Sequence, residues 1–353
     1  MKRHSIALMS AAAFAISACG TAAEGGGGGD NLPNRGIVPY DIVTLLRGAV
    51  PQPWLFAPTG DAAAMSFGDP SAVTTDDGVT LFGTAQQAGA HFVGRADSTT
   101  GLDFGAVESV LDDTPADARN PAVAVDADTG DWHLIFTTAD GLLHGTSQDA
   151  GRHFTLDAVP YLVADPDDPA EAGGLSGASL VIESGTAHLF YESRPAGRNG
   201  GLEEGANADH LAVIRHTAGP VSGGHFDRRT TVLSPGVACV DVTGADFPCW
   251  DVAGVGDPEV RSAKTAAGRR VWRLFYVGRS TTAEAIGFAA AFTPDTPFER
   301  YAYNPVLKDK ALKWGAPSNV QLDDGYLLYF GLTGRRLAVG VAENKNGVAS
   351  ERF

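Results

Sequence analysis

The stretch Asp257–Gly278, DPEVRSAKTAAGRRVWRLFYVG, contains one complete structural repeat. It opens on an acidic residue and a proline, continues as a short apolar strand, turns through a polar segment and returns as a second strand rich in aromatic residues. Proline at the first position of a strand removes no hydrogen bond from the sheet, so Asp-Pro is a natural strand entrance. The segment therefore predicts a β-hairpin.

The same pattern occurs four more times along the chain. The other copies are DPSAVTTDDGVTLFG from Asp69, NPAVAVDADTGDWHLIFT from Asn120, GASLVIESGTAHLFYES from Gly177 and APSNVQLDDGYLLYFG from Ala316. Further apolar runs between the copies supply outer strands, which gives units of about four antiparallel strands. Each unit buries its faces only against its neighbours. The repeat predicts an all-β fold, a five-bladed β-propeller, and a β-sandwich would not need the same strand opening five times.

Three segments with different roles are predicted along the chain. Residues 1–18 place two basic residues before an apolar stretch too short to span a bilayer, which is typical of an export signal. The signal ends in ISACG, which resembles the lipobox of bacterial lipoproteins and implies that Cys19 is lipidated. By the sorting habit of that family, Gly20 implies the outer membrane. Residues 19–35 form a glycine-rich tether, and 36–353 form a single propeller domain.

The net charge argues against one class of partner, and the cysteines argue against a metal site. The formal net charge is −16, and loss of the two basic residues in 1–18 makes it −18 (−16 − 2). Such a surface repels phosphate backbones, which argues against nucleic acid as a partner. Cys239 and Cys249 close a short loop in an exported protein, so a disulfide is favoured over a metal site. We expect a monomer with no metal and no cofactor.

Residues 250–330 are similar to the five-bladed propeller glycosidases of the arabinanase, levansucrase and invertase superfamily, which includes glycoside hydrolase families 43 and 32. The matching segments, in order, are WD at 250, GVGDPEV, RLFYVG, AIGFA, FERYAYNPVL, a tryptophan at 314 and APSNVQLDDGYLLYFG. A weaker similarity extends over about 60–345. The resemblance implies a carbohydrate ligand. SQDAGRHF at 147–154 also matches the Asp-box hairpin of sialidase propellers, which supports the propeller without supporting a sialidase.

The residues that open the inner strands are the predicted pocket residues. In a propeller these positions face a pocket at one end of the central channel, and here they are Asp69, Asn120, Gly177, Asp257 and Ala316. The resemblance implies three catalytic acids at such openings. Asp69 matches the first acid, whereas Asn120 and Gly177 stand where the second and third are expected. An amide or a glycine cannot exchange a proton at neutral pH, so the usual acid set is incomplete.

Substitute acids are available elsewhere in the sequence. By resemblance Asp69 is the base, and the acid would come from Asp257, Glu192 or the acidic loop at 193–210. Glu259 and Arg261 follow Asp257 at intervals of two residues and so share its strand face, where we expect Arg261 to neutralise Glu259.

The predicted ligand-binding residues also include aromatic side chains, because indole rings stack on sugar rings. The full set is Asn120, Glu259, Arg261, Trp54, Trp250 and Trp314. For each tryptophan, packing in the core is an equally good interpretation.

Two hypotheses for the function follow from the sequence. In the first, the protein is a lipid-anchored propeller of the cell envelope that binds or hydrolyses a glycan, with Asp69 and Asp257 as pocket carboxylates. In the second, it is a catalytically silent propeller that acts as a binding or scaffolding lipoprotein. Asn120 and Gly177 are the residues that keep the second hypothesis open.

Overall fold

The computed structural model describes most of the chain between residues 66 and 344. The described residues are 66–112, 115, 117–195, 212–224, 226, 228–236, 250–264, 268–280, 284–301, 304–307, 313–322, 325–333 and 338–344. All of them belong to one compact unit, Leu32–Phe353. Their regular elements are strands alone, and none of these residues forms a helix able to cross a membrane.

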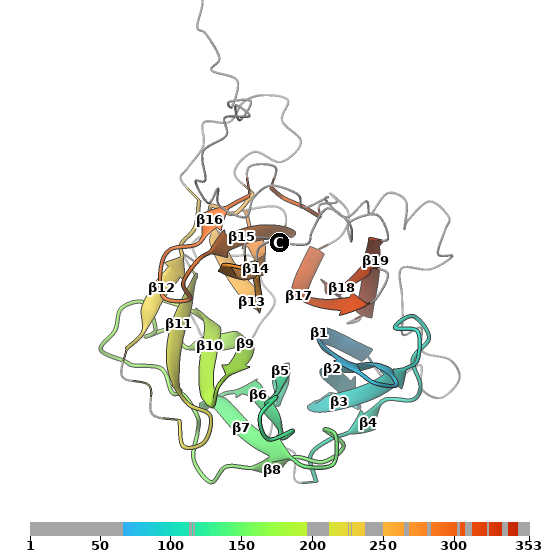
Figure 1. Ribbon diagram of the computed structural model, residues 1–353. Coiled ribbons are helices and arrows are strands. Elements are labelled where there is room, and N and C mark those ends of the chain that lie inside the picture. Colours follow the sequence, from blue (N-terminus) through green and yellow to red (C-terminus); the bar gives the residue numbers. More distant parts are fainter. Residues whose placement is uncertain are drawn as a thin grey trace, which may run out of the picture. The chain divides into compact units, whose positions relative to one another are not determined.

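The strands form five antiparallel sheets (Figure 1), and in each sheet the first strand in the sequence lies next to the centre. The first sheet contains β1 (Ser66–Thr75), β2 (Gly78–Gln87), β3 (Ala90–Ser98) and β4 (Glu108–Ser109). The second contains β5 (Arg119–Val125), β6 (Trp132–Thr138), β7 (Gly141–Ser147) and β8 (Thr155–Leu156). The third contains β9 (Leu175–Glu183), β10 (Thr186–Ser193), β11 (Val213–Pro220) and β12 (Thr230–Leu233).

The last two sheets complete the ring. The fourth contains β13 (Gly254–Lys264), β14 (Arg270–Arg279), β15 (Glu284–Ala291) and β16 (Glu299–Arg300). The fifth has three described strands, β17 (Lys313–Leu322), β18 (Gly325–Thr333) and β19 (Ala338–Asn344). The inner strands β1, β5, β9, β13 and β17 contact one another in that order, and β17 contacts β1. The predicted all-β, five-bladed propeller is confirmed, with four strands in each of the first four blades.

The hydrophobic core lies in wedges between neighbouring blades. Between blades 1 and 2, for example, Phe82 of β2 packs with Leu134 and Phe136 of β6. Between blades 3 and 4, Phe190 of β10 packs with Trp272 of β14. Because both faces of a blade are covered, the second strands of blades 1–4 are buried along most of their length. Burying their apolar side chains is the main stabilising term.

Each inner strand bends sharply within its first four residues, at the residue that the repeat predicts to open it, so the strands begin one to three residues earlier than the sequence predicts. The opening residue has a positive φ in all five blades: Asp69 50°, Asn120 50°, Gly177 44°, Asp257 45° and Ala316 33°. The pairing register with the second strand shifts at the same place in every blade, as expected for a β-bulge. Bulges re-aim side chains, and this one turns the opening residue toward the central pocket described below.

In four of the five blades, the residue two positions after the opening joins its blade to the next one. Its side chain accepts a backbone N–H from the following inner strand in four of the five junctions. The bonds are Val123 N to Ser71 Oγ (2.9 Å), Val260 N to Ser179 Oγ (2.9 Å), Asn319 N to Glu259 Oε1 (3.2 Å) and Ala72 N to Ser318 Oγ (2.9 Å). Ala122 occupies the fifth position and has no acceptor atom. The inner strands are therefore linked edge to edge by side chains.

In the sequence, His133, His188 and Arg273 occupy one recurring position of the second strands, where a polar residue predicts an exposed strand position. For His133 this prediction is wrong. His133 is buried, and its Nδ1 lies 3.0 Å from Nε2 of His144, whose Nδ1 lies 2.8 Å from Asp157 Oδ2. His188 and His216 form a similar stacked pair in blade 3. Burial lowers the pKa of His133 and lowers that of His216 to about 4. The lowered pKa values of His133 and His216 favour the neutral imidazole at these two positions.

Removal of one inter-blade acceptor tests the side-chain ring. We expect Ser318→Ala to lower the free energy of unfolding by about 1–3 kcal/mol, because the N–H of fully buried Ala72 loses its partner. Ser66→Ala is the matched control, since Ser66 Oγ makes a 3.4 Å contact to Gln86 at a partly exposed position and should change stability by less than about 0.5 kcal/mol. Urea unfolding measures both. Equal effects would contradict the ring.

Candidate functional site

The five strand openings surround one pocket. Its lining consists of the opening residues, the residues that follow them, and Ser71 and Glu259: Asp69, Pro70, Ser71, Asn120, Pro121, Gly177, Ala178, Asp257, Pro258, Glu259, Ala316 and Pro317. The pocket is an open hollow of about 310 Å³ that includes solvent space, and its cavity volume is only about 20 Å³. That cavity volume suffices for about one water molecule, so a larger ligand would lie in the open part of the hollow. The pocket brings Asp69 of blade 1 and Asp257 of blade 4 together, as the repeat predicts.

Asp257 is held through both its backbone and its side chain. Its carboxylate Oδ2 accepts a hydrogen bond from Arg279 Nη2 at 3.1 Å, and its backbone N–H donates to Glu192 Oε2 at 3.3 Å. Its Oδ1 lies over Gly177, only 2.7 Å from the place where a Cβ would stand. Burial raises the pKa of the Asp257 carboxyl, although the Arg279 guanidinium opposes the rise. The group is therefore disposed to carry a proton.

Glu192 is ionised and enclosed by arginines. Its side chain is 1% exposed; Oε1 accepts from Arg194 Nε at 2.9 Å, and Oε2 accepts from both Nη atoms of Arg279 at 3.0 Å. Burial opposes ionisation, but the charges of Arg279 and Arg194 outweigh it and lower the pKa of Glu192 to about 2. A carboxylate in this state has no proton to give. The geometry thus argues against Glu192, one of the three predicted sources of the acid.

Glu192 instead matches a position that supports the next blade. In blade 1, Thr84 pairs with Gly68, the residue before the opening, and Thr84 Oγ1 accepts the N–H of Asn120 at 2.8 Å. In blade 3, Glu192 pairs with Ser176, the residue before Gly177, and accepts the N–H of Asp257. The signal was present in the sequence: Thr84 and Glu192 each stand two residues after the phenylalanine of a Leu-Phe pair in a second strand.

Glu259 and Arg261 form the pair that their spacing predicts. Arg261 donates to Glu259 Oε1 from Nε and Nη2, each at 2.8 Å, and also donates to the carbonyl of Ala72 in blade 1 at 3.0 Å. Burial raises the pKa of Glu259, and Arg261 opposes the rise. Because the same Glu259 oxygen accepts the Asn319 N–H, the pair connects blades 4, 5 and 1.

Of the tryptophans predicted to bind the ligand, the structure describes the side chain of Trp250 alone. Its ring lies 5.5 Å from that of Tyr276 and against Gly278 and Gly287 of blade 4, and it does not line the pocket. Trp250 is thus a packing residue.

Several other predicted positions lie outside the described residues. These are Trp54, the side chain of Trp314, Cys19, Cys239, Cys249 and residues 196–210 of the acidic loop. Among the residues that are described, no group of three or more His, Cys, Asp and Glu side chains is arranged to hold a metal ion.

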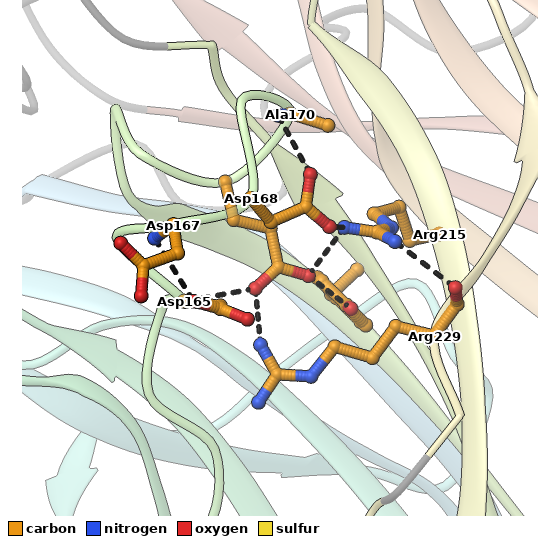
Figure 2. Close-up of polar contacts among 8 residues, drawn as sticks. Asp165, Asp167, Asp168, Ala170, Arg215 and Arg229 are labelled. Carbon is orange, nitrogen blue, oxygen red and sulfur yellow. Dashed lines mark hydrogen bonds and ion pairs between the residues drawn. The ribbon is translucent and has the colours of Figure 1, made fainter.

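A second buried ion network fastens blade 3 to the segment that precedes it (Figure 2). Fully buried Glu171 accepts from Tyr191 Oη at 2.7 Å and Arg215 Nη1 at 2.8 Å through Oε1, and from Arg229 through Oε2. Arg215 also pairs with Asp168, whose pKa it lowers. Sequence patterns missed this network because its members are far apart in the chain. Both oxygens of Glu171 are engaged, and none of these residues lines the pocket.

Comparison with solved structures finds the same fold in several glycoside hydrolases. No protein-family model and no curated protein sequence matches the chain. Among solved structures, a thermostable family-43 glycoside hydrolase has 17% identity and a TM-score of 0.60, covering 82% of this chain and 93% of its own. An endo-1,4-β-xylanase from Bacteroides thetaiotaomicron has 16% identity and a TM-score of 0.58, with coverages of 80% and 95%.

A third similar structure comes from a different hydrolase family. The catalytic domain of the Coprinopsis cinerea GH62 α-L-arabinofuranosidase has 10% identity and a TM-score of 0.59, covering 83% of this chain and 95% of its own. At these identities the likeness establishes the fold alone. The predicted resemblance to glycosidase propellers is confirmed at that level, and activity must be argued from the pocket.

A glycine exchange tests the placement of Asp257. In Gly177→Ala the new Cβ meets Asp257 Oδ1 at 2.7 Å, whereas the Cβ of Gly185→Ala, on the turn of the same hairpin, meets nothing within 4 Å. Both positions have positive φ, so each variant carries backbone strain of about 1–2 kcal/mol. We expect the larger loss of stability in Gly177→Ala, because the Asp257 carboxyl must also move. Equal losses in urea unfolding would show that the two do not touch.

Proposed function

We propose that the protein is a glycoside hydrolase whose carboxyl pair is Asp69 and Asp257. The observation that carries the proposal is that both residues, one from blade 1 and one from blade 4, line the pocket formed by the strand openings. The glycosidase-type fold supports it. So does the difference between the neighbouring carboxyls, since burial favours a protonated Asp257 while two arginines keep Glu192 ionised.

The chemistry divides between the two groups. Asp257 donates its proton to the glycosidic oxygen as the bond from that oxygen to the anomeric carbon breaks. Asp69, as a carboxylate, takes a proton from the water that attacks the same carbon. Asn120 lines the pocket beside them, where its amide can hydrogen-bond a sugar hydroxyl but cannot exchange a proton.

The lining favours a neutral glycan. No lysine or arginine occurs among the described residues that line the pocket. Two arginines that contact lining residues are already paired, Arg279 with Glu192 and Asp257, and Arg261 with Glu259. A uronic acid would bring a further carboxylate to Asp69 and Asp257 without a free cation to offset it.

Amide variants of the two acids test the mechanism. We expect Asp69→Asn and Asp257→Asn each to lower kcat about 10²–10⁴-fold on the aryl glycoside or polysaccharide that the full chain cleaves in a substrate panel. Glu183→Gln, in an exposed ion pair with Arg270, is the control and should retain activity. The wild-type rate should fall as pH rises through the raised pKa of Asp257, because the donor is then deprotonated. Full activity of either Asn variant would contradict the assignment.

A second function, a binding propeller without catalysis, is favoured by Asn120 and Gly177. These residues stand where the sequence resemblance implies two further acids. Binding of an oligosaccharide to the wild-type chain, without turnover of any member of the panel and with loss of binding in Asn120→Ala, would support this alternative.

We also propose that the protein is exported and anchored to the outer membrane through a lipid on Cys19. The lipobox-like ISACG and the glycine-rich segment after it support this location. In a Gram-negative host, Cys19→Ser should abolish incorporation of labelled fatty acid and move the protein from the membrane to the soluble fraction. Cys239→Ser is the matched control and should remain lipidated. Continued labelling of Cys19→Ser would refute the anchor.

A further inference from the structure

Glu192 and Arg279 bind different groups of Asp257, its backbone N–H and its carboxylate. The Asp257 N–H and both Nη atoms of Arg279 converge on the same oxygen of Glu192, at 3.3, 3.0 and 3.0 Å. Arg279 Nη2 also donates to the Asp257 carboxylate at 3.1 Å. The left-handed backbone of Asp257 and the direction of its side chain are thus held by one ion pair.

The Glu192–Arg279 contact fits because residue 256 is a glycine and has no side chain. A Cβ on Gly256 would lie 1.8 Å from Glu192 Oε2 and 2.4 Å from Arg279 Nη1. The residue before the opening in blade 2 is Arg119, so the bend itself does not require a small residue there. Gly256 is needed because the carboxylate and the guanidinium occupy the place of its side chain.

Blade 1 shows that support of the backbone alone needs no charge. Thr84, at the position equivalent to Glu192, supports Asn120 with one neutral hydroxyl. Burying a glutamate between two arginines costs more than burying a hydroxyl, since the ions must be desolvated. The charged acceptor, Glu192, lies beside the acid Asp257, and the neutral acceptor, Thr84, lies beside Asn120.

We propose that Glu192 and Arg279 are a positioning pair for Asp257, which hold its backbone bend and aim its carboxyl into the pocket for proton donation. The proposal rests on the proposed function for its catalytic consequence. The pair acts with opposite charges, since the carboxylate of Glu192 disfavours ionisation of Asp257 and the guanidinium of Arg279 favours it. The other groups around Asp257 are Arg194, which follows β10, and the backbone N–H of Ala316 in β17, both of which favour ionisation.

Direct titration of Asp257 tests the electrostatic part. In the full chain labelled with ¹³C at Asp carboxyls, the Asp257 signal is the one that Asp257→Asn removes. We expect Glu192→Gln to move its titration midpoint down and Arg279→Gln to move it up, each by about 1 pH unit or more. Glu183→Gln is the matched control, because the Glu183–Arg270 pair also joins blades 3 and 4 but is exposed, and it should leave the midpoint unchanged.

A conservative variant, which retains the buried negative charge, tests whether Glu192 holds the backbone of Asp257. It can be used even if the amide variants fail to fold. Glu192→Asp shortens the side chain by one methylene and withdraws the acceptor from the Asp257 N–H. We expect faster hydrogen exchange of that amide, and a kcat at least 10-fold lower with KM nearly unchanged; Glu183→Asp should change neither.

Two results would overturn the positioning pair: an Asp257 midpoint that stays fixed in folded Glu192→Gln and Arg279→Gln, or wild-type amide exchange in Glu192→Asp. Failure of the proposed function is a separate outcome. A wild-type chain that cleaves no glycoside would refute hydrolysis, while the titration and exchange measurements would still decide whether the pair holds Asp257.

Discussion

Each inner strand contains, within its first four residues, one residue with φ between 33° and 50°, and a bulge in the pairing register accompanies it. This bend sends the opening side chain toward the channel and the side chain two residues later toward the next blade. The pocket and the ring of inter-blade hydrogen bonds therefore arise from the same four-residue unit, GDPS in blade 1 and GDPE in blade 4. The core wedges between the second strands supply the burial that offsets the strain.

The backbone requirement also changes how the acids of the pocket are interpreted. Asp, Asn and Gly tolerate left-handed φ better than other residues, so their presence at four openings has a conformational cause as well as a chemical one. An acid at an opening is thus not in itself a sign of catalysis. Asp257 differs from Asn120 in the groups that hold it. The Glu192–Arg279 ion pair binds the backbone N–H and the carboxylate of Asp257, whereas a single hydroxyl, that of Thr84, accepts the backbone N–H of Asn120.

Features that recur in each hairpin could be predicted from the sequence, whereas contacts between residues far apart in the chain could not. The five openings, the blades and the Glu259–Arg261 pair all follow from spacings within one hairpin. The role of Glu192 depends on contacts with Arg279 in the next blade, and Glu171 meets Arg215 and Arg229 more than 40 residues away. The burial of His133 was missed because a polar residue on a strand is usually exposed, whereas both faces of a propeller blade are covered.

The most direct test of the shared pocket is an amide NMR titration of the full chain with an oligosaccharide from the substrate panel. The account predicts that the backbone resonances of the openings shift together and saturate with one Kd: Asp69, Asn120, Gly177, Asp257 and Ala316. Shifts confined to one blade, or to residues outside the strand openings, would contradict a common site at the centre of the propeller.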